Sequence, residues 1–312
     1  MKRVAQTLHP TRTMAAFDRR ILGATGRDVG PIGLGSSYGL SGRDVERAFE
    51  RGVDFFLWGS RRRGDFGRGL REVARKDRAR ATIAIQTYAR AAWVMPGSVE
   101  RALRELGTEY VDILCLAWWN GPPAERIVER AMALRDAGKV RHLMISCHER
   151  PTFERHVADG RYCALMVRYN AAHPGAEREV FPFVEAAGPR DRRPGVVAFT
   201  ATRWGALLEP RFTPPGDRTP SASDCYRFAL SNPTVDVCLS GPRDGAELDE
   251  ALSAVERGPL DQAEMAWMRR VGAHVRAETK LQPRGGVMSL LDRLATLGTS
   301  CGSARQLPRA AG

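Results

Sequence analysis

The chain has 312 residues, of which 43% are hydrophobic and 27% are charged. These fractions are typical of soluble globular proteins and exclude the collagen-like, disordered and disulfide-scaffold classes. The formal charge of +12 comes almost entirely from arginine, since only Lys2, Lys76, Lys139 and Lys280 are lysines among the 48 basic residues. The arginines are interspersed with 36 acidic residues along predicted helix faces, so we expect no nucleic-acid partner.

The sequence pattern contains no targeting or membrane signal. No apolar run approaches the roughly 18 residues needed to cross a bilayer. The basic start at Met1 to Arg3 is followed by polar residues instead of an apolar signal segment. These features favour a cytoplasmic protein with no membrane partner.

The cysteines and histidines predict no metal centre. The six cysteines contain no Cys-x-x-Cys pair. The six histidines are isolated and offer no ligand set at zinc or iron–sulfur spacing. We interpret the cysteines as reduced core residues and expect no bound metal.

The first predicted element is a short hairpin over Arg20 to Val29, with its turn at Ala24 to Arg27. Eight strand-like runs follow, separated by stretches long enough for one helix and a right-handed crossover each. The strands are predicted to begin near Pro31, Val53, Thr82, Tyr110, Arg141, Ala164, Val196 and Val235. The helices are predicted over Asp44 to Glu50, Phe66 to Arg78, Val99 to Leu106, Ala124 to Ala137, Arg178 to Ala187, Ser223 to Leu230 and Ala246 to Val255.

Eight β–α units predict a single (β/α)8 TIM barrel with an N-terminal β-hairpin cap; a doubly wound open sheet is the alternative. We expect the barrel over residues 20–280, after an extension over 1–19. The tail over 281–312 is expected to be disordered or to form one short helix near Val287 to Leu297. The sequence does not predict an oligomeric state.

Glycine and serine positions indicate where helices end and begin. The pattern places Gly52, Gly107 and Gly138 just after helices, where a left-handed residue ends a helix at little cost. It places Ser98 and Ser223 at helix starts, as N-caps.

Six short segments between Arg20 and Arg257 follow one another in a recognisable order. They are Leu22 to Gly35, Gly52 to Phe56, Leu103 to Asp112, Gly138 to Arg141, Tyr169 to Asn170, and Val237 to Gly241. Together they resemble the aldo-keto reductase superfamily. The resemblance implies a (β/α)8 barrel that binds a nicotinamide cofactor, usually NADPH, and transfers hydride to a carbonyl.

In that superfamily four residues support hydride transfer. An aspartate pairs with a lysine, the lysine lowers the pKa of a tyrosine acid, and a histidine orients the substrate. The corresponding positions here hold Leu57 for the aspartate, Tyr88 for the lysine, Arg62 for the tyrosine and Ala117 for the histidine. The resemblance therefore implies an atypical active site whose catalytic residues are unknown, with Tyr88 and Tyr38 as candidate proton donors.

The resemblance places residues for NADP(H) at Ser146, Phe199, Thr200, Gly241 and Arg243. Ser146 matches a serine that holds the carboxamide, and Phe199 matches the aromatic ring on which the nicotinamide stacks. The turn from Gly241 to Arg243 suits an adenosine phosphate, since a helix N-terminus and an arginine both attract anions.

Four neighbouring positions depart from the superfamily pattern. Asparagine is usual at the positions of Cys147 and Ala251, and glutamine at the position of Met166. Glu247 stands where glutamine or arginine is usual. The sequence therefore leaves open whether NADP(H) still binds.

Two functions follow from these observations. The first is an NAD(P)H-linked carbonyl oxidoreductase with an altered proton donor. The second is a catalytically inactive pseudoenzyme barrel that binds or senses a small anionic ligand through Arg61 to Arg63, with Trp118 and Trp119 offering a flat wall for an aromatic ring. We interpret His148, His173 and Arg168 as scaffold residues in either case.

Overall fold

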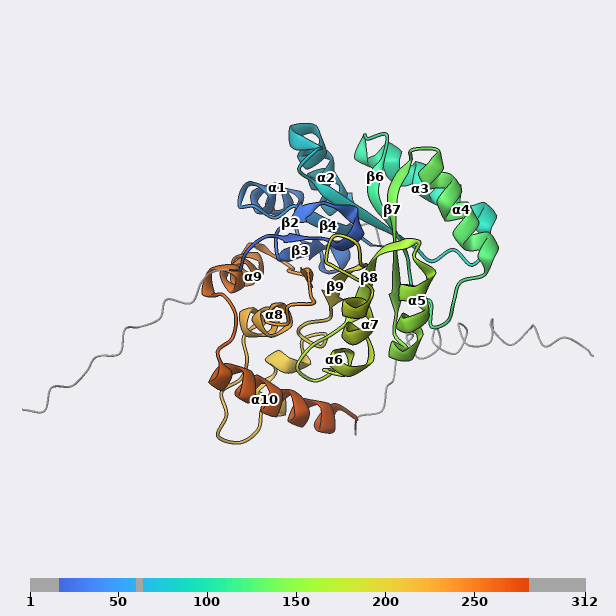
Figure 1. Cartoon of the computed structure of the whole chain (residues 1–312). Coiled ribbons are helices and arrows are strands. Elements are labelled where there is room, and N and C mark those ends of the chain that lie inside the picture. The colour runs from blue at the N-terminus through green and yellow to red at the C-terminus, as the bar shows by residue number, and fades with distance from the viewer. Residues whose placement is uncertain (1–16, 60–63, 281–312) are drawn as a thin grey trace, which may run out of the picture.

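The computed structural model describes residues 17–59 and 64–280. Eight parallel strands close into a barrel in the order β10–β3–β4–β5–β6–β7–β8–β9 (Figure 1). The strands are β3 (Ile32–Gly35), β4 (Phe55–Trp58), β5 (Thr82–Thr87), β6 (Val111–Leu116), β7 (Val140–Cys147), β8 (Tyr162–Arg168), β9 (Gly195–Phe199) and β10 (Val237–Ser240). The closed barrel confirms the predicted fold, and the open-sheet alternative is wrong.

Helices surround the barrel and follow its strands (Figure 1). They are α1 (Gly42–Glu50), α2 (Gly64–Asp77), α3 (Met95–Leu106), α4 (Glu125–Asp136), α5 (Phe153–Asp159), α6 (Ala176–Glu179), α7 (Phe181–Ala186), α8 (Ala222–Leu230), α9 (Gly245–Arg257) and α10 (Gln262–Lys280). Short 3-10 turns are η1 (Gly23–Thr25), η2 (Ser36–Tyr38), η3 (Ala92–Val94), η4 (Arg150–Thr152), η5 (Ala206–Leu208) and η6 (Pro210–Phe212). Helices α5 and α10 were not among the predicted helices, and the helix predicted over Arg178 to Ala187 is split into α6 and α7 at Val180.

The predicted hairpin is confirmed at the N-terminal side of the barrel. Strands β1 (Arg20–Ile21) and β2 (Asp28–Val29) pair antiparallel around η1. The backbone of Gly23 lies so close to Gly195 that a Cβ atom on Gly23 would come within 2.0 Å of the Gly195 nitrogen. Only glycine fits there, and Ala24 N–H donates to the Arg193 carbonyl beside it at 2.9 Å. The hairpin is thus fixed against the start of β9.

The helix ends agree with the glycine predictions but not with the serine predictions. Gly52, Gly107 and Gly138 all have positive φ after helices. Ser98 lies inside α3, which begins three residues earlier. Ser223 is buried inside α8, and Ser221 is its N-cap, because Ser221 and Asp224 bond reciprocally to each other's backbone N–H in a capping box.

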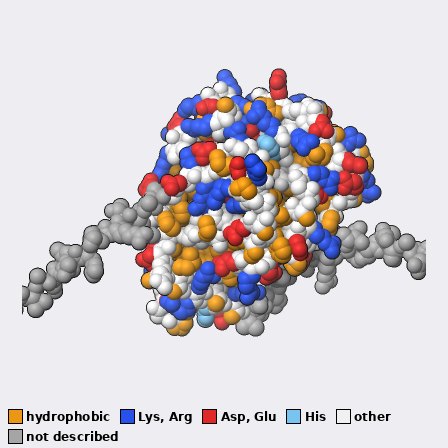
Figure 2. Space-filling view, in the orientation of Figure 1, with side chains coloured by type: hydrophobic (Ala, Val, Ile, Leu, Met, Phe, Trp, Pro, Cys, Tyr) orange, Lys and Arg blue, Asp and Glu red, His pale blue; other side chains and the backbone are white. Residues whose placement is uncertain are grey.

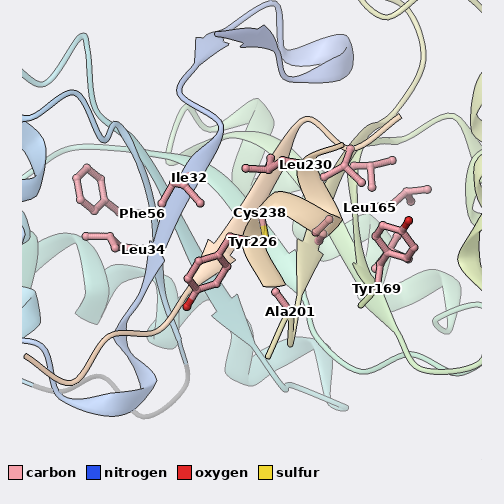
Figure 3. Close-up of a cluster of buried hydrophobic side chains, with 14 of the residues drawn as sticks. Ile32, Leu34, Phe56, Leu165, Tyr169, Ala201, Tyr226, Leu230 and Cys238 are labelled. Atoms are coloured by element: carbon pink, nitrogen blue, oxygen red, sulfur yellow. The ribbon is translucent and has the colours of Figure 1, made fainter. Parts of the chain in front are cut away.

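Side chains alternate between two cores. Residues that point inward form a narrow central cluster, including Phe55, Ala84 and Val237. Residues that point outward pack under the helices, as Figure 3 shows for Cys238 of β10 beside Tyr226 and Leu230 of α8. This alternation decides which side chain of each strand reaches the barrel mouth.

The amino ends of the strands carry three buried aspartates. Asp54 accepts from Gly30 N–H at 2.9 Å and from Arg19. Asp112 accepts from Ile83 N–H at 2.9 Å and pairs with Arg78 at 2.8 Å. Asp236 accepts from Val196 N–H at 2.8 Å and from Arg190. Each carboxylate therefore accepts a hydrogen bond from the backbone of a neighbouring strand or of the residue after the hairpin, and also pairs with an arginine.

Positive and negative side chains are interspersed on the face shown in Figure 2. Within residues 17–59 and 64–280, no helix has both the length and the hydrophobicity to cross a membrane. The predicted extension before Phe17 and the tail after Lys280, with its possible helix near Val287, lie outside the described residues.

Candidate functional site

A pocket of about 750 Å³ opens at the carboxyl ends of the strands. Every barrel strand contributes to its lining, either from its carboxyl end or from the loop that follows it, and helices α8 and α9 add further residues. This is the end of a (β/α)8 barrel where loops converge and where binding sites are built. The pocket lining includes Tyr38, Leu57, Gln86, Tyr88, Trp118, Ser146, His148, Met166, Phe199, Thr200, Trp204, Glu209, Tyr226, Leu239, Ser240, Gly241, Arg243, Glu247 and Glu250.

The floor of the pocket is apolar. Leu57, Met166 and Leu239 belong to the central cluster and are less than a tenth exposed. Polar groups are added by Gln86, Ser146 and Ser240, and the Gln86 Nε2 lies 3.7 Å from the Met166 sulfur, a weak acceptor. A ligand at this floor meets mainly hydrocarbon.

One wall of the pocket is made of rings. The ring of His148 lies between those of Trp118 and Phe199, with centroid distances of 5.3 Å and 5.7 Å. The His148–Phe199 contact is edge-on, a favourable geometry for aromatic pairs. The indole Nε1 of Trp118 is buried and has no hydrogen-bond acceptor among the described residues, which leaves a donor unsatisfied beside the pocket.

Backbone strain is concentrated at this mouth. Trp118, Thr200, Arg203 and Trp204 are the non-glycine residues with positive φ in the described ranges, with φ between 53° and 61°. Three of them line the pocket. Arg90 helps to hold the first, since its guanidinium donates to the carbonyls of Ala117 and Trp118 and stacks on Trp119. Left-handed backbone at bulky residues costs energy, and such residues cluster at functional sites.

The positions matched to the acid–base residues are not all at the pocket. Leu57 and Tyr88 line it, whereas Ala117 is fully buried and is replaced at the lining by Trp118. Thr87, at the end of β5, does not line the pocket, because Gln86 and Tyr88 take the inward positions on either side. Arg62, with Arg61 and Arg63, lies outside the described residues.

The two candidate proton donors are both at the rim. Tyr38 is 49% exposed and Tyr88 is 44% exposed. Burial of part of its ring raises the pKa of Tyr38. Lys76 and Lys139 pair with Glu50 and Glu100 on the outer helices and do not line the pocket, so neither lowers a tyrosine pKa there.

At one end of the pocket, the predicted phosphate turn is bound by a side chain of the protein itself. The backbone N–H of Arg243 donates to one oxygen of Glu247 at 2.8 Å, and its Nε donates to the other at 2.8 Å. Asp244 caps α9 by accepting from Glu247 N–H at 3.0 Å. The turn thus presents a carboxylate where the resemblance expects a phosphate to bind.

The other predicted cofactor residues are brought together at the floor and ring wall. Ser146 is buried, and its hydroxyl accepts from Trp118 N–H at 2.8 Å. Thr200 donates its hydroxyl to the Phe199 carbonyl at 2.6 Å. The residues at this end are compatible with a nicotinamide ring, but the Glu247 carboxylate does not fit the phosphate of NADP(H).

Several pocket residues were not predicted from the sequence. Tyr226 and Glu250 come from helices outside the recognised segments, and Gln86 and Trp204 had no distinguishing motif. For Gln86 the signal was present, since strict alternation in β5 puts it on the same face as Ala84. In the described part of the chain, no group of three or more His, Cys, Asp or Glu side chains is placed to hold a metal ion.

Comparison with known proteins gives a family-model match and the fold. Residues 66–209 match the model of the aldo/keto reductase family. The holo form of aldo-keto reductase AKR11C1 from Bacillus halodurans superposes with a TM-score of 0.69 at 19% identity, covering 81% of this chain and 96% of that one. An aldo/keto reductase from Klebsiella pneumoniae in complex with NADP and acetate gives 0.67 at 17% identity, covering 82% and 96%.

A second structure from Klebsiella pneumoniae, an aldo-keto reductase in complex with NADPH, gives a TM-score of 0.66 at 18% identity over 83% of this chain and 95% of that one. Members of the family are typically NADP-linked oxidoreductases. The family match and the shared eight-stranded barrel agree with the six segments recognised in the sequence. Residues 66–209 therefore match the aldo/keto reductase family model, and the chain has the (β/α)8 barrel fold of the solved aldo-keto reductases.

Proposed function

We propose that this protein is a pseudoenzyme of the aldo/keto reductase family, which binds a small molecule in the mouth pocket and no longer reduces carbonyls. The observation that carries the proposal is the apolar floor. Leu57 and Ala117 occupy two of the four acid–base positions and bring no polar group to the reaction site.

The chemistry of carbonyl reduction explains why this matters. Hydride attack on a carbonyl leaves an alkoxide, which must receive a proton. A tyrosine with an ordinary pKa near 10 donates poorly unless a neighbouring cation lowers that value. No lysine is among the described pocket residues, and the pKa of Tyr38 is shifted upward.

The walls indicate what the pocket binds. The Trp118–His148–Phe199 wall faces a space also bordered by Tyr38, Tyr88 and Trp204. A planar ring would gain contact area against these side chains. We therefore propose a small aromatic ligand. An anionic group on it would depend on Arg61 to Arg63.

A second candidate is a reductase with a different proton donor. Tyr38 and Tyr88 line the same pocket as Ser146 and Phe199, so a phenol is available at the mouth. Under this candidate, purified wild-type protein reduces aldehydes, and Tyr38→Phe or Tyr88→Phe abolishes the rate.

The experiment that tests the pseudoenzyme proposal restores the missing positions singly and together. Tyr88→Lys alone places an ammonium near apolar Leu57 without a carboxylate partner, so we expect no aldehyde reduction. Residues that act as a unit contribute non-additively. Only the combined Leu57→Asp, Arg62→Tyr, Tyr88→Lys and Ala117→His variant is expected to gain a rate, measured by NADH or NADPH consumption. Activity in the single variant would contradict the proposal.

A further inference from the structure

The turn after β10 has its anion donors engaged by the protein itself. Arg243 uses its backbone N–H, its Nε and its Nη2 on the two oxygens of Glu247. The pair is one helical turn apart and lies at the start of α9. Both residues line the mouth pocket, so the pair is part of its wall.

The surroundings of this pair add negative charge. Glu209 and Glu250 line the same pocket, and Arg243 is the only arginine or lysine among its described lining residues. Glu250 accepts from Ala222 N–H at the start of α8 at 2.9 Å. The described lining thus holds three carboxylates and one guanidinium. Glu209 lies 3.8 Å from Arg211, and the guanidinium of Arg243 is already bound to Glu247.

We propose that Glu247 is a built-in substitute for a bound phosphate, so that the pocket excludes ligands that carry a phosphate at this turn and accepts their unphosphorylated counterparts. For a dinucleotide, the excluded form is the 2′-phosphorylated one. The inference does not depend on whether the protein catalyses a reaction, since it concerns which ligands can enter.

Two physical arguments support the exclusion. A phosphate at the turn would either lie beside the Glu247 carboxylate, where like charges repel, or displace it from three charge-assisted hydrogen bonds. Protonation offers no easy escape, because the hydrogen bonds from Arg243 hold the pKa of Glu247 below its ordinary value.

The Tyr38 ring lies against the backbone of this turn, since a Cβ atom on Gly241 would lie 2.5 Å from it. Exclusion of the phosphate therefore rests on a repulsive carboxylate at the turn as well as on donors that are already engaged.

The test compares two nucleotides that differ in the relevant group. Binding of adenosine 2′,5′-bisphosphate and of 5′-AMP is measured by isothermal titration calorimetry on the full chain. The proteins are wild type, Glu247→Gln, Glu247→Gln with Arg243→Ala, and Asp249→Asn as the control. Asp249 loses the same charge from the same helix, but it pairs with Arg47 and Arg51 and does not line the pocket.

We expect wild type to bind the bisphosphate no more tightly than 5′-AMP. Glu247→Gln should bind the bisphosphate at least tenfold more tightly than wild type, with 5′-AMP unchanged, and the added Arg243→Ala should remove the gain. Gln can still accept from the Arg243 N–H, so the start of α9 is retained; if this variant melts below wild type, Glu247→Ala replaces it.

Three results would overturn the inference. The first is that wild type binds the bisphosphate more tightly than 5′-AMP. The second is that neither Glu247 variant gains affinity for the bisphosphate, which includes the case in which none of the proteins binds it. The third is that Asp249→Asn gains the same affinity for the bisphosphate. Failure of the proposed function is distinguishable, because wild-type turnover with NADH but not NADPH would refute the pseudoenzyme and leave the exclusion of phosphate standing.

Discussion

The two ends of the barrel are built from opposite chemistry. At the amino ends, the carboxylates of Asp54, Asp112 and Asp236 are buried, and each is held by a backbone N–H and an arginine. At the carboxyl ends, an apolar floor and a ring wall surround a pocket bordered by strained residues such as Trp118 and Trp204. The amino end therefore stabilises the fold, and the carboxyl end gives up stability for a binding surface.

The largest expected effect comes from removing an amino-end carboxylate. Asp112→Ala leaves the Arg78 guanidinium and the Ile83 N–H without their buried acceptor. Breaking a buried pair in this way costs about 3–5 kcal/mol of unfolding free energy. Urea unfolding measures it. Asp249→Asn, which removes an exposed partner of Arg47, should cost far less, and equal losses in the two variants would contradict this assignment.

Matched leucines test the difference in packing. Leu114 of β6 is fully buried under the helices, so Leu114→Ala should cost about 2–5 kcal/mol. Leu57→Ala should cost clearly less, because its side chain already borders the pocket and water can fill the space. Urea unfolding of both variants decides the order, and a larger loss for Leu57→Ala would show that the floor is part of the stabilising core.

The sequence predicted the barrel and the regions of the mouth, because inward and outward alternation and strand–helix spacing are local properties. It did not predict the ion pairs of the three buried aspartates. Their partners Arg19, Arg78 and Arg190 come close only after the hairpin and helices have packed against the barrel. At the mouth, Ala117 is buried and Trp118, which has a positive φ, takes the lining position beside it. The Arg243–Glu247 ion pair could have been predicted from the sequence, because the two residues have the i,i+4 spacing of helical ion pairs.

Stability should fall in mild acid because of His173, which lies beside the pocket loops. Burial, followed by the charges of Arg203 and Arg168, lowers the pKa of His173 to about 3. In the unfolded chain the imidazole titrates near 6.5, so only the unfolded state takes up this proton between pH 6.5 and pH 3, and its contribution to stability is lost as pH falls through that window.

The variant His173→Gln lacks this proton uptake. Between pH 7.5 and pH 4.5, its melting temperature should therefore fall less than that of wild type, as measured by differential scanning calorimetry. Parallel pH profiles of the two proteins would show that His173 is not kept neutral by the fold.

The smallest expected effect comes from relieving strain at the mouth. Trp204 is 56% exposed and has a φ of 53°, so Trp204→Gly should raise the unfolding free energy by about 1 kcal/mol. Trp93 is also exposed but lies in η3 without a positive φ, so Trp93→Gly should lower it by about 0.5–1 kcal/mol. Thermal unfolding of the two variants measures the sign of each change in unfolding free energy. Destabilisation by Trp204→Gly would mean that the packing of the Trp204 ring contributes more to stability than the strain of its backbone costs.

The most direct measurement is the rate of aldehyde reduction by wild type relative to the Tyr38→Phe, Tyr88→Phe double variant. It is recorded with NADH and with NADPH over a panel of aliphatic and aromatic aldehydes. Because the described floor residues include no acid–base pair and the described lining residues include no lysine, we predict equal rates at the level of buffer alone. A wild-type rate well above that of the double variant would show that the barrel is a working reductase with one of these tyrosines as its proton donor.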